Sequence, residues 1–177
     1  PRARMQVLSI LLKLRQVCCH PKLFLPDYEG SSGKLELLVQ IVHNAIAAKR
    51  RMLIFSQFVG MLQMIRKRLG RQGVQTLYLD GETRPDKRQE LCDRFNGGEG
   101  RVFLISLKAG GTGLNLTGAD LVIHYDPWWN PAAEDQATDR AHRIGQTHDV
   151  DVVKLIAQGT IEEKVTDLSK RKRAVFD

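Results

Sequence analysis

Short apolar segments alternate with helical patterns along this chain, and few folds accommodate that alternation. The segments are rich in β-branched and other apolar residues and are bounded by turn formers. They occupy residues 51–55, 74–79, 101–105, 120–125 and 151–157. Strands of this composition are buried on both faces, and helical crossovers are the connections that parallel strands require. The sequence therefore predicts an α/β fold, in which a mostly parallel central sheet is covered by helices on both faces.

Helical periodicity and start and stop signals place the helices. The expected helices span residues 3–18, 34–49, 57–70, 83–95, 131–144 and 160–173. Thr83 opens the fourth of these, and Asn130, which caps well, opens the fifth together with Pro131. A length of 177 residues is typical of one domain with a sizeable core. The expected parts are an N-terminal helix and loop (1–33), a core (34–158) and a C-terminal helix (159–177).

The overall charge favours a polyanionic partner, because the net charge is +7 and the pI is near 9.5. No apolar run reaches the roughly 18 residues of a membrane span, and no signal-peptide pattern is present, so we expect neither a membrane partner nor secretion. Because the chain begins at Pro1, we expect a fragment of a longer protein. Three cysteines make no disulfide framework, which indicates a reducing compartment. Cys18, Cys19 and His20 are too crowded to chelate one zinc ion, so no metal site is predicted.

Polar and glycine-rich stretches follow the first four predicted strands. They are "SQF" (56–58), "DGET" (80–83), "SLKAGGTGLN" (106–115) and "DPWWN" (126–130). The carboxyl ends of parallel strands lie at one edge of a sheet, and ligands bind there. We therefore expect the functional residues at this edge.

The stretch "SLKAGGTGLNLTGA" (106–119) contains four glycines, which let the backbone approach a ligand and point N–H groups at anions. It matches neither G-x-G-x-x-G nor the phosphate-loop pattern G-x-x-x-x-G-K-[ST]. "GSSGKL" (30–35) resembles the phosphate-loop pattern but does not match it. Its glycines are three rather than five residues apart, Leu35 replaces Ser or Thr, and no strand precedes it. The chain therefore lacks a loop that holds a nucleotide's phosphates unaided.

The predicted helix over 131–144 places Gln136, Arg140 and Arg143 within about 60° of one another on one face. One interpretation is a solvated stripe with i,i+4 ion pairs. However, the acidic residues of the helix lie mostly off this face, which favours an external anion. A guanidinium placed where charge develops contributes roughly 10³–10⁵ in the rate of phosphoryl transfer. We therefore expect the arginines to complete a nucleotide site whose other half lies elsewhere.

The segment from "SLKAGGTGLN" to "DQATDRAHRIGQ" (106–146) resembles motifs V and VI of the SWI/SNF-type DNA-dependent ATPases, within the superfamily-two helicases. "RMLIFSQF" (51–58) resembles motif IV, and "LRQVCCHP" (14–21) is similar to the family's "LR-x-x-C-x-HP", with Cys19 where Asn is usual. The resemblance spans nearly the whole chain. It implies the second RecA-like lobe of a two-lobed motor, the first lobe of which carries the phosphate loop and the acidic magnesium motif.

The resemblance also implies roles for individual residues at the nucleotide. Arg140 and Arg143 match the two arginines that reach the γ-phosphate of ATP across the cleft, and Gln136 matches the glutamine of the same motif. Gly113 and Asn115 match the part of motif V that faces the nucleotide. The Mg²⁺ that accompanies ATP is expected to be held mainly by the first lobe.

A second set of residues is implied to contact the backbone of double-stranded DNA. These are Ser56, Gln57, Gly81, Thr83, Ser106, Lys108, Ala109, Gly110, Trp129 and Asn130. For Ser56, Gly81 and Thr83, a turn or cap role is an equal alternative. Trp128 and Trp129 are adjacent and are expected to face opposite ways, with Trp128 packing and Trp129 beside DNA. The run "KRKR" (170–173) is a solvated helix end or, less favoured, a DNA contact.

We therefore expect an RecA-like lobe of an ATP-driven translocase on double-stranded DNA, with its own first lobe and DNA-bound proteins as partners. The resemblance implies a location at the nucleoid in the cytoplasm of a prokaryote or in the nucleus of a eukaryote. Two alternatives stay open. A basic nucleic-acid-binding module explains the charge but not the alignment of Gln136 with the arginines. An RNA helicase lobe of the DEAD-box type shares the fold, but its motif VI lacks "HRIGQ".

Overall fold

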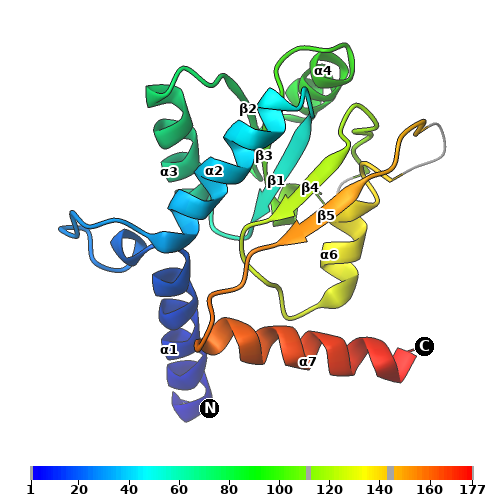
Figure 1. The fold of residues 1–177 in the computed structure, drawn as a ribbon. Coiled ribbons are helices and arrows are strands. Elements are labelled where there is room, and N and C mark those ends of the chain that lie inside the picture. Colours follow the sequence, from blue (N-terminus) through cyan, green and yellow to red (C-terminus); the bar gives the residue numbers. More distant parts are fainter. Residues whose placement is uncertain (1, 111–112, 143–145, 177) are drawn as a thin grey trace.

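A five-stranded parallel sheet forms the centre of the molecule (Figure 1), in a computed structural model that describes residues 2–110, 113–142 and 146–176. The order across the sheet is β2-β3-β1-β4-β5, and each neighbouring pair is parallel. The strands are β1 (Met52–Ser56), β2 (Thr76–Leu79), β3 (Val102–Ser106), β4 (Leu121–His124) and β5 (Asp151–Lys154). The predicted parallel α/β fold is confirmed.

Helices surround this sheet, and α1 and α7 lie at the end toward which the strand arrowheads point (Figure 1). The helices are α1 (Arg2–Cys19), α2 (Gly33–Ala47), α3 (Val59–Arg71), α4 (Pro85–Asn96), α5 (Leu107–Gly110), α6 (Pro131–Thr138) and α7 (Ile161–Phe176), with a 3-10 turn at Pro21–Leu23. No described helix is long and apolar enough to cross a membrane.

Alternate strand residues enter two separate cores. Met52 and Ile54 of β1 pack with apolar residues of α2 and α3, whereas Leu53 and Phe55 pack with residues of α4 and α6. The same alternation holds along β3 and β4. Because both faces of the sheet are covered, its strands are apolar at consecutive positions, which is why they were recognisable in the sequence.

Helix α6 ends at Thr138, so the predicted helix over 131–144 is wrong at residues 139–142, and residues 143 and 144 lie outside the described part of the chain. Residues 139–141 form a turn, and the backbone carbonyl of Arg140 accepts a hydrogen bond from the N–H of Leu116 at 2.9 Å. This carbonyl therefore accepts a hydrogen bond from the 113–119 loop and not from a further turn of the helix.

Other details of the elements also differ from the sequence prediction. Thr83 does not cap α4, whose cap position is Arg84, because the Thr83 hydroxyl bonds to Asp80. Strand β5 ends at Lys154 rather than at residue 157. The glycine-rich stretch after β3 begins with a short helix, α5, in which Gly110 is required because a Cβ there would lie 2.9 Å from the Phe55 ring.

Helix α1 carries apolar residues at helical spacing that the described chain leaves uncovered. Val7, Ile10 and Leu14 are 55%, 57% and 46% exposed, respectively. Near the end of the helix the burial changes, because Arg15 and Cys19 are buried against the sheet end. Only this last part of α1 is therefore fixed to the rest of the fold by buried side chains of the described residues.

Candidate functional site

Two serines lie side by side at the edge of the sheet where functional residues were predicted. Ser56 ends β1 and Ser106 ends β3, and they are Cα partners in the sheet register. Both are buried. The Ser56 hydroxyl donates to Asp126 at 2.5 Å and accepts from the N–H of Phe58, while the Ser106 hydroxyl accepts from the N–H of Ala109 at 3.3 Å. Each hydroxyl therefore shapes the turn that follows its strand.

Asp126 is a buried carboxylate that the sequence prediction missed. Its second oxygen accepts from the backbone N–H of Gln57 at 3.3 Å. Burial raises the pKa of Asp126, and the hydrogen bonds from Ser56 and Gln57 act in the opposite direction. Its position directly after a buried strand was a signal that pointed to it. Asp126 joins the turn after β1 to the segment after β4.

The turn after β2 holds Gly81 and Thr83. Asp80 organises it, because one carboxylate oxygen accepts from the N–H groups of Glu82 and Thr83 at 2.9 and 3.2 Å. Arg88 of α4 donates to the carbonyls of Gly81 and Thr83. Gly81 is exposed. The structure thus gives Thr83 a turn-forming role, and it leaves Gly81 at the surface of this edge.

Lys108 is exposed on α5, directly after β3. Its neighbours Ala109 and Gly110 are buried, and Gly110 packs against Phe55. The exposed lysine therefore lies between buried residues at the carboxyl end of the sheet.

A cavity of about 1100 Å³ lies along α6. Its lining combines amides, carboxylates and a guanidinium from α6, from the turn after it and from the loop after β3. The lining residues are Asn115, Asn130, Ala132, Ala133, Asp135, Gln136, Asp139, Arg140 and His142. Three residues predicted to contact the nucleotide, Asn115, Gln136 and Arg140, thus share one cavity with Asn130.

These nucleotide candidates do not form one helical stripe. Gln136 lies on α6 and is exposed, whereas Arg140 lies in the turn after it and is buried. Gly113 adopts a positive φ of 74°, which favours glycine, and it begins the described part of the loop that contributes Asn115. Arg143 lies outside the described residues. The cavity therefore brings together Gln136 and Arg140, two of the three residues that the predicted helix was expected to align.

Gln146 fixes the loop that carries Asn115 against the turn that carries Arg140. Its side-chain amide donates to the carbonyls of Thr117 and Ala119, both at 2.9 Å, and to that of Ala141 at 3.1 Å. The sequence contained this residue in "HRIGQ", but its role depends on contacts between segments that are far apart in the sequence. Gln146 therefore maintains the wall of the cavity.

Asn130 and Glu134 hold the start of α6. The Asn130 side chain accepts from the N–H of Ala132 at 3.2 Å, which confirms the predicted cap. Glu134 is buried, accepts from the N–H of Trp128 at 2.7 Å and pairs with Lys154 of β5 at 2.7 Å. Sequence reasoning missed Glu134, because a carboxylate in the first turn of a helix is ordinarily solvated.

The expectation that Trp128 and Trp129 face opposite ways is wrong. Both ring centroids lie 5.2 Å from the guanidinium carbon of Arg15, because the backbone bends at Trp129. Trp128 also packs on the core formed with α4 and α6, as expected. Trp129 is half-buried. Arg15 is a further residue that sequence reasoning missed.

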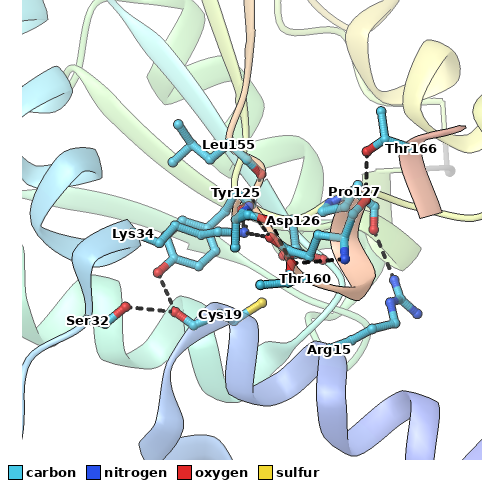
Figure 2. Close-up of polar contacts among 12 residues, drawn as sticks. Arg15, Cys19, Ser32, Lys34, Tyr125, Asp126, Pro127, Leu155, Thr160 and Thr166 are labelled. Atoms are coloured by element: carbon cyan, nitrogen blue, oxygen red, sulfur yellow. Dashed lines mark hydrogen bonds and ion pairs between the residues drawn. The ribbon is translucent and has the colours of Figure 1, made fainter. Parts of the chain in front are cut away.

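Lys34, the lysine of the rejected phosphate-loop pattern "GSSGKL" (30–35), has a structural role. From α2 it donates to the carbonyls of Tyr125 at 3.0 Å and Leu155 at 3.3 Å, and it pairs with Glu162 of α7 (Figure 2). Its side chain is 6% exposed. This lysine therefore joins the ends of β4 and β5 to α7 and is not available to a phosphate.

The basic end of α7 is exposed, as expected for 170–173, and two of its side chains make surface contacts with α6 and the segment before it. Arg173 pairs with Asp135 at 2.5 Å, and Lys172 reaches the carbonyl of Trp129 at 3.5 Å. Both residues are exposed. These contacts place α7 beside the α6 end of the candidate site.

Comparisons with known proteins agree with this architecture. The family described as the helicase conserved C-terminal domain matches residues 33–145. The chain is 44% identical over 177 residues to the "Putative ATP-dependent helicase/translocase YwqA" of Bacillus subtilis, covering 97% of this chain and 19% of that protein. It is 38% identical over 182 residues to the mouse (Mus musculus) SWI/SNF-related matrix-associated actin-dependent regulator of chromatin subfamily A member 1, covering 96% of this chain and 17% of that protein.

A solved structure shows the same fold. The Sulfolobus solfataricus SWI2/SNF2 ATPase core in complex with dsDNA superposes with a TM-score of 0.80 and 39% identity, covering 96% of this chain and 36% of that chain. This chain spans less than a fifth of the length of the curated relatives named above.

The chain belongs to the helicase conserved C-terminal domain family. Within that family it is a second, C-terminal RecA-like lobe of the SWI/SNF type.

Proposed function

We propose that this chain is the second motor lobe of an ATP-dependent translocase that moves along double-stranded DNA and remodels protein–DNA complexes. The observation that carries the proposal is the cavity along α6, in which Asn115, Gln136 and Arg140 come together. Amide and guanidinium N–H groups are suitable donors to phosphate oxygens. The cavity thus fits the phosphates of ATP, which a first lobe of the parent protein would enclose from the other side.

In this proposal Arg140 and Arg143 stabilise the charge that develops on the γ-phosphate during hydrolysis. Gln136, Gly113 and Asn115 contact the bound nucleotide. Mg²⁺ neutralises phosphate charge and is held mainly by residues of the first lobe. Gln146 and the Arg140 carbonyl act indirectly, because they hold the loop and the turn in place.

The DNA-facing residues lie along the carboxyl edge of the sheet. Lys108 is exposed there and pairs with a backbone phosphate, and Gly81 and Trp129 are accessible at the same edge. Ser56, Gln57, Thr83, Ser106 and Asn130 support this surface through their turns and through the cap of α6. Contacts to phosphates carry no sequence information, so little sequence preference is expected.

A turnover assay on the chain alone tests the proposal. Because the sequence contains no phosphate loop, we expect no ATP hydrolysis with or without DNA, and only weak nucleotide affinity. The Arg143→Ala variant is the matched control, since it removes activity that belongs to the chain but not activity of a contaminating ATPase. Steady hydrolysis by the purified chain that disappears in Arg143→Ala would contradict the two-lobe account.

A further inference from the structure

The guanidinium of Arg15 lies in a cage of aromatic rings between the end of α1 and the segment that follows β4. Its central carbon is 5.2 Å from the ring centroids of Trp128 and Trp129 and 5.9 Å from that of Phe58. Figure 2 shows Arg15 reaching from α1 to Pro127, whose carbonyl accepts a hydrogen bond at 3.0 Å. Arg15 is 5% exposed.

Burial of this cation has a cost that an apolar residue would avoid. Desolvation lowers the pKa of Arg15, and the nearby carboxylate of Asp126 opposes that shift. The planar guanidinium does more than fill space. It attracts the faces of two indole rings and donates a hydrogen bond in a fixed direction. These contacts fix the orientation of the segment 126–130, whereas an aliphatic side chain would only fill the space.

The segment 126–130 connects the turn after β1 with the start of α6. Asp126 holds the turn after β1 through Ser56 and Gln57, and Asn130 caps the helix that lines the nucleotide cavity. Trp129 lies between them and is half-buried. A group that fixes this segment from α1 therefore acts on the DNA edge and on the nucleotide cavity together.

We propose that Arg15 is a positioning residue that sets the orientation of Trp129 and the start of α6. Through it, the position of α1 determines how well DNA is engaged and how strongly DNA stimulates hydrolysis. The expected effect of Arg15 on ATP hydrolysis rests on the proposed function. The positioning of Trp129 and α6 by Arg15 does not, because it is a property of the fold.

The test uses the Arg15→Met variant of the full-length parent protein, with the exposed Arg4→Met on the same helix as matched control. Methionine fills the cage without a charge, so the thermal midpoint is expected to be unchanged or raised. The DNA concentration that gives half-maximal ATPase activity should rise about five- to thirtyfold, as expected for loss of the cation–π contacts and one charged hydrogen bond. Hydrolysis without DNA should fall by a smaller factor than hydrolysis with DNA, because Arg15 affects the nucleotide cavity only through the start of α6.

Amide hydrogen exchange gives a readout that does not depend on activity. Exchange in the peptide covering 126–138 should become faster in Arg15→Met and stay unchanged in Arg4→Met, with no change in β1 or α2. In a Trp129→Ala background, Arg15→Met should have no further effect on the DNA dependence, because Arg15 acts through Trp129.

Three outcomes would overturn the proposal. The first is that amide exchange in Arg15→Met rises uniformly over the chain while all activities are lost in parallel. The second is that Arg15→Met and Arg4→Met behave equally, and the third is that the effects of Arg15→Met and Trp129→Ala on the DNA dependence are additive. If the wild-type parent shows no DNA-stimulated hydrolysis, the proposed function fails, and the exchange comparison alone then decides whether Arg15 positions the segment.

Discussion

At the scale of single residues, buried ionisable side chains support the edge that carries the candidate site. His124 ends β4, is buried, stacks on Phe55 with ring centroids 5.6 Å apart, and has its Nε2 atom 3.0 Å from the hydroxyl of Thr138 at the end of α6. Desolvation by burial lowers the pKa of His124 to about 4. The neutral imidazole therefore belongs to the native contact between the sheet and α6.

We predict that His124 makes the stability of the fold dependent on pH. Its pKa is about 4 in the folded state and about 6.5 in the unfolded state. Between these values the unfolded state binds more protons, so stability is complete above about pH 6.5 and falls as the pH decreases toward 4. From about pH 7.5 to about pH 5 the loss should be roughly 2 kcal/mol.

Urea unfolding of the chain at those two pH values measures this loss. The His124→Gln variant should lose less stability than the wild type on acidification, whereas His148→Gln, at an exposed position, should behave as the wild type does. Identical pH dependence in all three proteins would show that His124 is not the titrating group.

Lys108 provides a second prediction at this scale. Because its ammonium is exposed and is proposed to pair with a phosphate, Lys108→Ala in the parent protein should weaken binding equally for DNA of different sequence. The log–log dependence of affinity on salt should flatten by about one unit. Lys67→Ala, an exposed lysine on α3, is the control and should leave the slope unchanged. A slope unchanged in Lys108→Ala would indicate a structural role for this lysine.

At the scale of elements, α7 is held to the core by a buried ion pair. Glu162 is 1% exposed, pairs with Lys34 and accepts from the N–H of Ala157 at 2.8 Å. Removing one partner of a buried pair leaves an uncompensated charge, which is strongly destabilising. The end of α7 then reaches α6 through Arg173 and Asp135.

We therefore predict that Glu162→Gln destabilises the chain by about 3 kcal/mol and loosens α7. Glu163→Gln changes the same residue type at the next position, where the side chain is exposed, and should shift stability by less than about 0.5 kcal/mol. Chemical denaturation of both variants checks the difference. Equal stabilities would mean that the Lys34 contact does not hold α7.

The strands and most helices could be predicted, because burial on both faces gives strands consecutive apolar residues and because the periodicity of helices is local. The end of α6 could not be predicted, since the Arg140 carbonyl is taken by Leu116, which lies in another loop. The role of Arg15 could not be predicted either, because its hydrogen-bond partner Pro127 lies 112 residues away in the sequence. Sequence patterns indicated which residues gather at the site, whereas the long-range contacts that support them appear only in the fold.

At the scale of the whole molecule, we propose that the candidate site is one half of a nucleotide site that a first lobe of the parent protein completes. The described chain supplies a cavity with amide and guanidinium groups, and its sequence holds no phosphate loop. Its curated relatives are more than five times longer than the matched segment. Arg140 and Arg143 are therefore expected to contribute to hydrolysis only when the parent protein is intact.

The most direct measurement is the turnover of the full-length parent with Arg140→Ala or Arg143→Ala, alongside its affinity for duplex DNA. Because Arg140 is buried, a thermal melt of each variant must first show that the fold is retained. We predict that kcat falls by roughly 10³-fold or more, while DNA affinity stays within about threefold of the wild type. A loss of DNA affinity as large as the loss of turnover would mean that these arginines face DNA, and it would contradict the assignment of this cavity to the nucleotide.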